Sequence, residues 1–155
     1  MAEDCVDHAA TLAKLDERPC VTRELTIHGS HPNAEQFGDL SYYGSDAPAI
    51  RQLMDSDPAL ARRLHDRLPI YAAQVVWAAR WEMARTVDDV LARRTRALLL
   101  DAAAAIAMAG DVARLLAKEL ERDEQWQRDQ VARFTMIARN YLIHSTPNSG
   151  ATSGG

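Results

Sequence analysis

The chain of 155 residues contains seven glycines, and none of them is placed to hold a phosphate group. A dinucleotide-binding turn needs two glycines separated by one residue, between a strand and a helix. No pair of glycines has that spacing, and strands do not alternate with helices along the sequence. We therefore predict that this chain holds no nucleotide cofactor of its own. The glycines are Gly29, Gly38, Gly44, Gly110, Gly150, Gly154 and Gly155.

Cysteine, long apolar runs and excess positive charge are scarce as well. The two cysteines, Cys5 and Cys20, are too few for a four-ligand zinc site, and no secretory signal predicts an oxidising compartment. The most apolar stretch, Ala97 to Ala109, contains Asp101 and is shorter than the about 20 residues that span a bilayer. The net charge of −4 gives no general attraction to nucleic acid. We therefore expect a cytoplasmic protein without a transmembrane segment or a nucleic-acid partner.

Alanine, arginine and leucine are abundant, and these residues favour helices. We predict an all-α fold, a small bundle of about six short helices preceded by an extended connector. Residues 1–15 are expected to form a terminal helix and residues 16–41 the connector. Residues 42–143 are expected to form the helical domain and residues 144–155 a disordered tail.

Capping residues and prolines predict the boundaries inside the helical domain. A short helix is expected from Asp57-Pro58, and a central buried helix from Leu68-Pro69. Gly110 is expected to end the alanine-rich helix, and Asp111 to cap the next. The segment from Thr86 to Asp89 has the spacing of a capping box. The aromatic residues expected to fill the core are Trp77, Trp81, Trp126, Phe134 and Tyr141.

No motif in the sequence indicates a catalytic centre. His28 and His31 could share a metal ion, but no third ligand follows at a suitable spacing. Ser41, Ser45 and Cys20 have no sequence signature of a paired base. We therefore predict no catalytic, cofactor-binding or metal-binding residue in this chain.

The densest basic patch is Arg93-Arg94-Thr95-Arg96, which allows three interpretations. A helix dipole favours cations at the carboxyl end of the helix. Alternatively, the guanidinium groups bind carboxylates or carbonyls of a partner domain. A nucleic-acid surface is the third interpretation, and a short patch on an acidic chain fits it least. Arg80 and Glu82 interrupt an apolar helix, so we expect them to form ion pairs or to face an adjoining domain.

The block from Leu68 to Ala102 has a distinctive order of residues. An apolar helix with a central tryptophan is followed by an acidic residue, a small residue, an acidic turn and an Arg-Arg-Thr-Arg run. These places are taken by Trp77, Glu82, Ala84, Asp88, Asp89, Arg93, Arg94, Thr95 and Arg96. The order resembles the carboxy-terminal domain of FAD-dependent glycerol-3-phosphate dehydrogenases and alpha-glycerophosphate oxidases. Supporting matches at Tyr43-Gly44-Ser45, at His28-Gly29 and around Trp126 extend the likeness over about residues 1–142.

The resemblance implies that FAD is bound by a different domain, which also oxidises glycerol 3-phosphate to dihydroxyacetone phosphate. That FAD-binding domain is the expected partner, in the same polypeptide or in trans. The first residues resemble the helix that follows the last flavin-contacting loop, so we expect a fragment that is inactive alone. The alternatives are a subunit of a split dehydrogenase and a freestanding helical interaction or DNA-binding module.

The resemblance leaves open whether the electron acceptor is a quinone or oxygen, and it allows the whole enzyme to be peripheral at the inner face of the cell membrane. Under this hypothesis, charged residues of the chain are candidate contacts between the domains. These candidates are Arg93, Arg94, Arg96, Arg80, Glu82 and His28.

Overall fold

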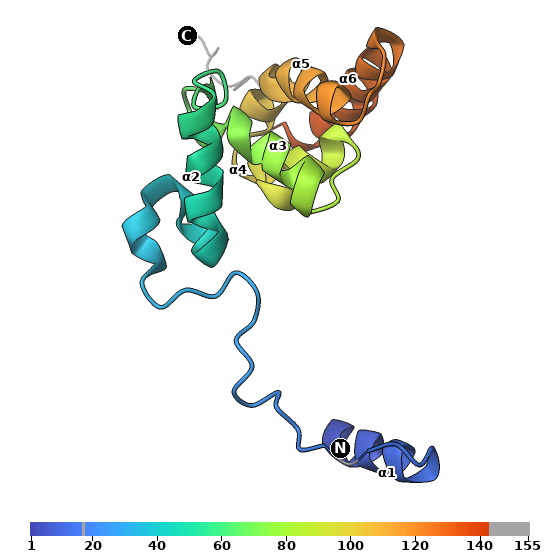
Figure 1. The fold of residues 1–155 in the computed structure, drawn as a ribbon. Coiled ribbons are helices and arrows are strands. Elements are labelled where there is room, and N and C mark those ends of the chain that lie inside the picture. The colour runs from blue at the N-terminus through green and yellow to red at the C-terminus, as the bar shows by residue number, and fades with distance from the viewer. Residues whose placement is uncertain (17, 143–155) are drawn as a thin grey trace, which may run out of the picture.

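The computed structural model describes residues 1–16 and 18–142, and helices form most of the architecture (Figure 1). The predicted all-α class is confirmed. The expectation for residues 144–155 lies outside the described residues. The helices α1 to α6 are Ala2–Leu12, Ala47–Ser56, Ala72–Trp81, Ala97–Leu100, Ala102–Glu119 and Glu124–Ala138. Three other helical segments are the 3₁₀ helices η1 (Ala34–Asp46) and η3 (Arg139–Tyr141) and the π-helix η2 (Asp89–Arg94).

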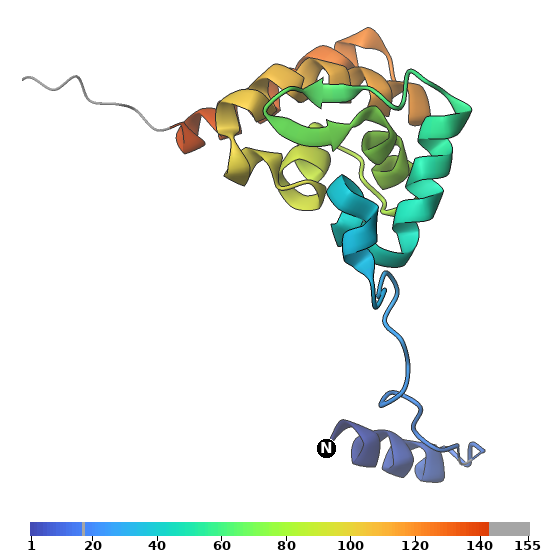
Figure 2. The same cartoon turned by 90° about the vertical axis from the view of Figure 1, so that its left-hand side faces the viewer.

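Helix α1 is set apart from the helical body by an extended segment (Figures 1 and 2). None of its residues is buried. The 3₁₀ turns of η1 begin at Ala34, so helical structure starts inside the segment 16–41 that was expected to be connector. Among the described residues, no helix has both the length and the apolar character needed to cross a membrane.

Two glycines let η1 change direction sharply. Gly38 has φ 58° and ψ −123°, and Gly44 has φ 52° and ψ −118°, a region that side chains rarely allow. At Gly44 the turn also packs on the preceding segment, where the N–H of Ser45 donates to the carbonyl of Gly29 at 3.1 Å. A Cβ at Gly44 would lie 1.7 Å from that carbonyl oxygen, whereas a Cβ at Gly38 would meet nothing within 4 Å. Only glycine therefore allows this contact.

A short antiparallel hairpin occupies the place where the central helix was expected to begin. Its strands are β1 (Arg63–His65) and β2 (Leu68–Tyr71), and it lies against α5 (Figure 2). In β2, Leu68 and Ile70 are buried while Pro69 between them is exposed, which is the alternation of a half-buried strand. Pro69 therefore belongs to an edge strand, and helix α3 begins only at Ala72.

The helix expected from Asp57-Pro58 is also absent. The carboxylate of Asp57 accepts a hydrogen bond from the N–H of Ala59 at 2.9 Å, which closes a turn. Leu64, a few residues further on, lies in β1 and packs on the core. Hairpin pairing across the chain therefore overrides the local helix signal.

Asp101, rather than Gly110, divides the alanine-rich segment. Asp101 is extended, with φ −158°, and its carboxylate accepts a hydrogen bond from the N–H of Ala104 at 2.9 Å. That bond caps the amino terminus of α5. Helix α5 then continues through Gly110, because burying residues such as Met108 and Val112 outweighs the roughly 1 kcal/mol cost of one glycine. The predicted end at Gly110 and the cap at Asp111 are therefore wrong.

Helix α3 lies between two apolar clusters. The large cluster includes buried residues of β2, α3, η2, α4, α5 and α6, and its members from α3 are Val75, Ala78 and Ala79. The small cluster is formed by η1, α2 and α3, and Ala73 and Trp77 are its members from α3. The expectation of a central helix buried on most of its circumference is therefore confirmed for Ala72 to Ala79.

The aromatic residues divide between the core and the surface. Trp77 and Phe134 are buried, as predicted, and Trp126 is partly buried against the large cluster. Trp81 and Tyr141 are exposed by 54% and 50%, so the prediction that they fill the core is wrong. Both residues lie at the carboxyl end of a helical element, and Trp81 stacks on the outer side of Trp77.

The contact between Gly44 and Gly29 can be tested with two alanine variants. Gly44→Ala should lower the free energy of unfolding by about 1–3 kcal/mol through backbone strain alone. The clash between the new Cβ and the Gly29 carbonyl should lower it further. Gly38→Ala is the matched control, since it has nearly the same backbone angles and open space around it. Urea unfolding followed by circular dichroism measures the stability of both variants. Equal losses of stability would contradict the role of the Gly44–Gly29 contact.

Candidate functional site

Five of the six candidate contact residues line two adjoining pockets. We call them the arginine pocket, of about 470 Å³, and the tryptophan pocket, of about 460 Å³. Glu82 and Arg94 line both pockets and so form the wall between them. The other residues of the arginine pocket are Tyr42, Tyr43, Arg93, Thr95, Arg96 and Leu100. Those of the tryptophan pocket are His28, Asp46, Trp77, Trp81 and Met83.

Arg80 is the candidate that lines neither pocket. Its Nε and Nη2 atoms donate to the two carboxylate oxygens of Glu119 at 2.6 and 2.9 Å. This bidentate pair joins α3 to α5, and the Arg80 guanidinium also lies 5.9 Å from the ring centroid of Trp81. The expected ion pair of Arg80 is therefore confirmed, and it lies within the domain.

The arginine run is positioned by a capping box and a π-helix. The Thr86 hydroxyl accepts a hydrogen bond from the N–H of Asp89 at 3.1 Å, and the Asp89 carboxylate accepts one from the N–H of Thr86 at 3.0 Å. The predicted capping box is therefore confirmed. The N–H and the hydroxyl of Thr95 both donate to the carbonyl of Val90, five residues earlier. Arg96 then adopts the left-handed conformation, with φ 55°. Both π turns and such residues are frequent at functional sites.

Two of the three arginines in the arginine pocket already have acidic partners. Arg93 lies 3.1 Å from the carboxylate of Asp88 and 3.3 Å from that of Asp89. Arg94 donates to the backbone carbonyl of Glu82 at 2.5 Å, and its Nε lies 3.8 Å from the carboxylate of Glu82. The expected ion pair of Glu82 is therefore confirmed. Arg96 forms no ion pair with any residue that the structure describes.

His28 reaches the tryptophan pocket from the extended segment before η1. Its Nε2 lies 2.9 Å from the carboxylate of Asp46, at the end of η1. Together with the contact between Gly29 and Ser45, this bond attaches the end of the connector to the helical body. His31, which the sequence paired with His28 as a possible metal site, instead stacks edge-on against Phe37. The described residues contain no cluster of metal ligands.

Three buried polar atoms around the pockets have no hydrogen-bond partner among the described residues. They are the hydroxyl of Tyr43, the indole nitrogen of Trp77 and one carboxylate oxygen of Glu82. Tyr43 and Trp77 are each only 7% exposed. Because an unsatisfied buried donor or acceptor costs about 1–3 kcal/mol, such groups are rare in folded proteins. All three atoms are enclosed by other atoms of this chain, so they belong to the buried side of the pocket walls.

A fully buried glutamine supports the rim of the arginine pocket. The side-chain oxygen of Gln74 accepts a hydrogen bond from the N–H of Tyr71 at 2.6 Å, and its nitrogen donates to the hydroxyl of Tyr42. The ring of Tyr42 packs on that of Tyr43, with centroids 4.4 Å apart. Sequence reasoning did not select these residues, although the match at Tyr43-Gly44-Ser45 pointed to this segment.

Burial raises the pKa of two side chains in the pocket walls, Glu82 and Tyr43. Burial raises the pKa of the Glu82 carboxyl, Arg94 partly offsets this, and Asp46 raises it further. The indole N–H of Trp77 also lowers the pKa of Glu82, although the two groups do not form a well-aligned hydrogen bond. Burial raises the pKa of the Tyr43 hydroxyl far above its usual value, so that this group stays protonated and can donate.

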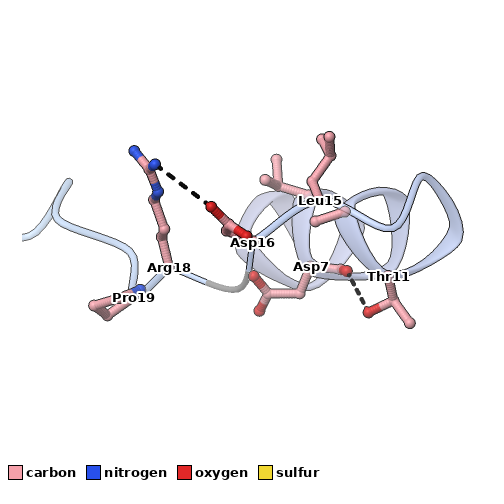
Figure 3. A pocket seen from close by; sticks show the side chains of 8 residues that line it. Asp7, Thr11, Leu15, Asp16, Arg18 and Pro19 are labelled. Carbon is pink, nitrogen blue, oxygen red and sulfur yellow. Dashed lines mark hydrogen bonds and ion pairs between the residues drawn. The ribbon is translucent and has the colours of Figure 1, made fainter.

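A third hollow, of about 640 Å³, lies beside α1 and carries no comparable group (Figure 3). Within it, the hydroxyl of Thr11 donates to the carbonyl of Asp7, and Arg18 lies 3.9 Å from Asp16. None of the residues that line it is buried. It is therefore an open surface depression beside α1 rather than a candidate binding site.

Comparisons with known proteins identify the family. The model of the C-terminal domain of alpha-glycerophosphate oxidase matches residues 20–127. The chain belongs to this family. It is 32% identical over 152 residues to a Caenorhabditis elegans protein named probable glycerol-3-phosphate dehydrogenase, mitochondrial. It is 29% identical over 162 residues to a mitochondrial glycerol-3-phosphate dehydrogenase of Arabidopsis thaliana. No solved structure matches.

The matches cover most of this chain but only a part of its relatives. Each covers 84% of the chain, and 21% of the Caenorhabditis protein or 26% of the Arabidopsis protein. The chain therefore spans about a fifth to a quarter of the length of these relatives. Both pockets lie within the region that matches the alpha-glycerophosphate oxidase domain.

The family is FAD-dependent, but the described residues of this domain do not fit FAD. Their only sheet is a hairpin of two short strands, with no helix crossing between parallel strands. Gly29, Gly38 and Gly44 have positive φ but are too far apart in the sequence to form one phosphate-binding turn. The described residues therefore lack the fold and the glycine turn by which dinucleotides are usually bound.

The raised pKa of Glu82 predicts a stabilising substitution. Glu82→Gln should raise the free energy of unfolding near neutral pH by about 1 kcal/mol, because it removes a charge that burial disfavours. The gain should fall as the pH drops from the folded pKa toward the unfolded pKa near 4.5, where wild-type Glu82 also becomes neutral in both states. Thermal unfolding from pH 4 to pH 8 measures it. A gain that is independent of pH would contradict this origin.

Proposed function

We propose that this chain is the helical C-terminal domain of an FAD-dependent glycerol-3-phosphate dehydrogenase and binds the FAD-binding domain through the two pockets. The whole enzyme oxidises glycerol 3-phosphate to dihydroxyacetone phosphate and passes the electrons to a quinone or to oxygen. The FAD-binding domain supplies the flavin and the reacting groups. This chain supplies a docking surface and is inactive alone.

The observation that carries this proposal is the family match over residues 20–127, within which both pockets lie. The buried atoms of Tyr43, Trp77 and Glu82 that lack partners lie around the same pockets. Trp81 and Met83 are exposed and line the tryptophan pocket, so they offer apolar surface that a partner domain can cover.

The partner is the FAD-binding domain of the same enzyme, either in one polypeptide or as a separate chain of a split dehydrogenase. A freestanding helical or DNA-binding module is the weaker alternative, because the chain is acidic and its arginines are mostly paired. We further propose a cytoplasmic location, with the whole enzyme peripheral at the inner face of the membrane. The two relatives are named as mitochondrial enzymes.

Exposed Trp81 provides a test of this docking surface. The chain should form a one-to-one complex with a separately produced FAD-binding domain of this enzyme family, measured by analytical ultracentrifugation. Trp81→Ala should weaken the complex about 30-fold, because Trp81 stacks on Trp77 at 4.4 Å and remains 54% exposed. Tyr141→Ala is the matched control, because Tyr141 is 50% exposed and lines neither pocket.

The same mixture tests catalysis. The chain alone should show no flavin absorbance and no oxidation of glycerol 3-phosphate, while the complex should reduce an artificial electron acceptor faster than the FAD-binding domain alone. Failure to form any complex, or stoichiometric flavin on the isolated chain, would overturn the proposed function. Equal losses of affinity in Trp81→Ala and Tyr141→Ala would show that docking does not use these pockets.

A further inference from the structure

Helix α3 ends in a turn that needs a left-handed residue. The N–H of Ala84 donates to the carbonyl of Ala78 at 2.9 Å, which closes the turn beyond the helix end at Glu82. Ala84 is buried and belongs to the large cluster, so the chain has to reverse at this point. Met83 makes the reversal with φ 59°. Glycine is the residue that adopts this backbone conformation without strain.

The turn holds a methionine whose side chain lies in water. Met83 is 76% exposed, so its side chain adds little to the packing of the domain. Among the described residues, four residues other than glycine have positive φ, namely Lys14, Met83, Arg96 and Glu121. Met83 is the only apolar one of the four. The isolated domain therefore loses stability to backbone strain at Met83 and gains no apolar burial in return.

Trp81 extends the apolar surface beside Met83. Both residues line the tryptophan pocket, and Trp81 is also exposed. The ring of Trp81 stacks on Trp77 with centroids 4.4 Å apart, and the Arg80 guanidinium lies 5.9 Å from its centroid. Trp81 is therefore held in one orientation, which reduces the entropy that a partner must remove on binding. Tryptophan and methionine are both enriched in protein interfaces.

The extended segment before η1 joins the helical body beside these residues. It ends at His28, which lines the tryptophan pocket and lies 2.9 Å from Asp46. The match to a C-terminal domain begins at residue 20, inside this segment. From residue 20 to His28 the chain spans at most about 30 Å. A domain that precedes residue 20 in the same polypeptide is therefore kept near Trp81 and Met83 at a high effective concentration.

We propose that Met83 is an anchor of the domain interface, and that its side chain enters an apolar hollow of the FAD-binding domain beside Trp81. This inference rests on the proposed function, and it names the residue and the apolar chemistry by which the partner is recognised. The strained turn presents the Met83 side chain outward. Its burial in the complex offsets the stability that the isolated domain loses at this turn.

Met83→Gly should have opposite effects on folding and on binding. It should raise the Tm of the isolated chain by about 2–4 °C, because glycine relieves the strain. It should weaken binding to the FAD-binding domain about 20-fold, because the apolar side chain is lost. Differential scanning calorimetry measures the Tm, and isothermal titration calorimetry measures the affinity.

Glu121→Gly is the matched control. Glu121 has φ 53° at the corresponding place after α5, is exposed, and lines neither pocket. Glycine at this position should raise the Tm by a similar amount, because it relieves the same kind of strain. It should leave the affinity for the FAD-binding domain unchanged.

Two further substitutions test the apolar chemistry. Met83→Gln keeps the length of the side chain but makes it polar, so it should weaken binding about as much as Met83→Gly does. Met83→Leu should weaken binding less than about 3-fold, because a similar apolar volume is kept. Met136→Gln is the control, since Met136 is exposed on α6 and lines neither pocket. It should bind as tightly as the wild type.

Oxidation of methionine locates the contact directly. Hydrogen peroxide transfers one oxygen atom to the sulfur of an exposed methionine, and water is released. In the isolated chain, Met83 and Met136 should oxidise at similar rates, because they are 76% and 68% exposed. In the complex, Met83 should oxidise about tenfold more slowly and Met136 at its former rate. Peptide mass spectrometry measures both rates.

The outcomes distinguish this inference from the proposed function. If no complex forms at all, both are overturned. If the complex forms and Met83→Gly binds as well as Glu121→Gly, only the inference is overturned. If Met83→Gly lowers the Tm, the side chain serves the fold and the inference is wrong. If the isolated chain sediments as a dimer in which Met83 is protected, a second copy covers this residue and the inference is again wrong.

Discussion

The domain depends on the burial of helix α3 between two layers of helices. Val75 and Ala78 pack into the large cluster with α5 and α6, while Ala73 and Trp77 pack into the small cluster with η1 and α2. A helix of mostly small side chains allows both layers to approach closely. Substitutions in α3 therefore affect both clusters, and the position of every element around the pockets follows from this packing.

Burying α3 on two sides also places polar groups where water does not reach them. Gln74 is fully buried, but it is satisfied by the N–H of Tyr71 and the hydroxyl of Tyr42. The indole of Trp77 and the hydroxyl of Tyr43 remain without partners. Buried side chains with and without hydrogen-bond partners thus lie close together in this domain, and Tyr43 and Trp77, which lack partners, line the pockets. The pockets present exposed side chains such as Trp81 and Arg96 to a partner, whereas these polar atoms lie behind them.

Some features that depend on neighbouring residues alone could be predicted from the sequence. The capping box of Thr86 and Asp89 needs only four consecutive residues, and it forms as predicted. Features that depend on distant residues could not. The hairpin that contains Pro69 forms because Arg63 pairs with Tyr71 across a turn and Leu68 and Ile70 are buried, and no helix-propensity rule includes those partners.

Sequence patterns were enough to establish the all-α class, the buried helix and the family, because each is written in local spacing or in a continuous motif. Tertiary packing alone decided that His28 joins Glu82 and Arg96 around adjoining pockets, since the Gly29–Ser45 contact and the π turn before Thr95 bring them together. It also decided which polar atoms lack partners. The burial of an atom depends on the assembled core, so it cannot be read from the sequence alone.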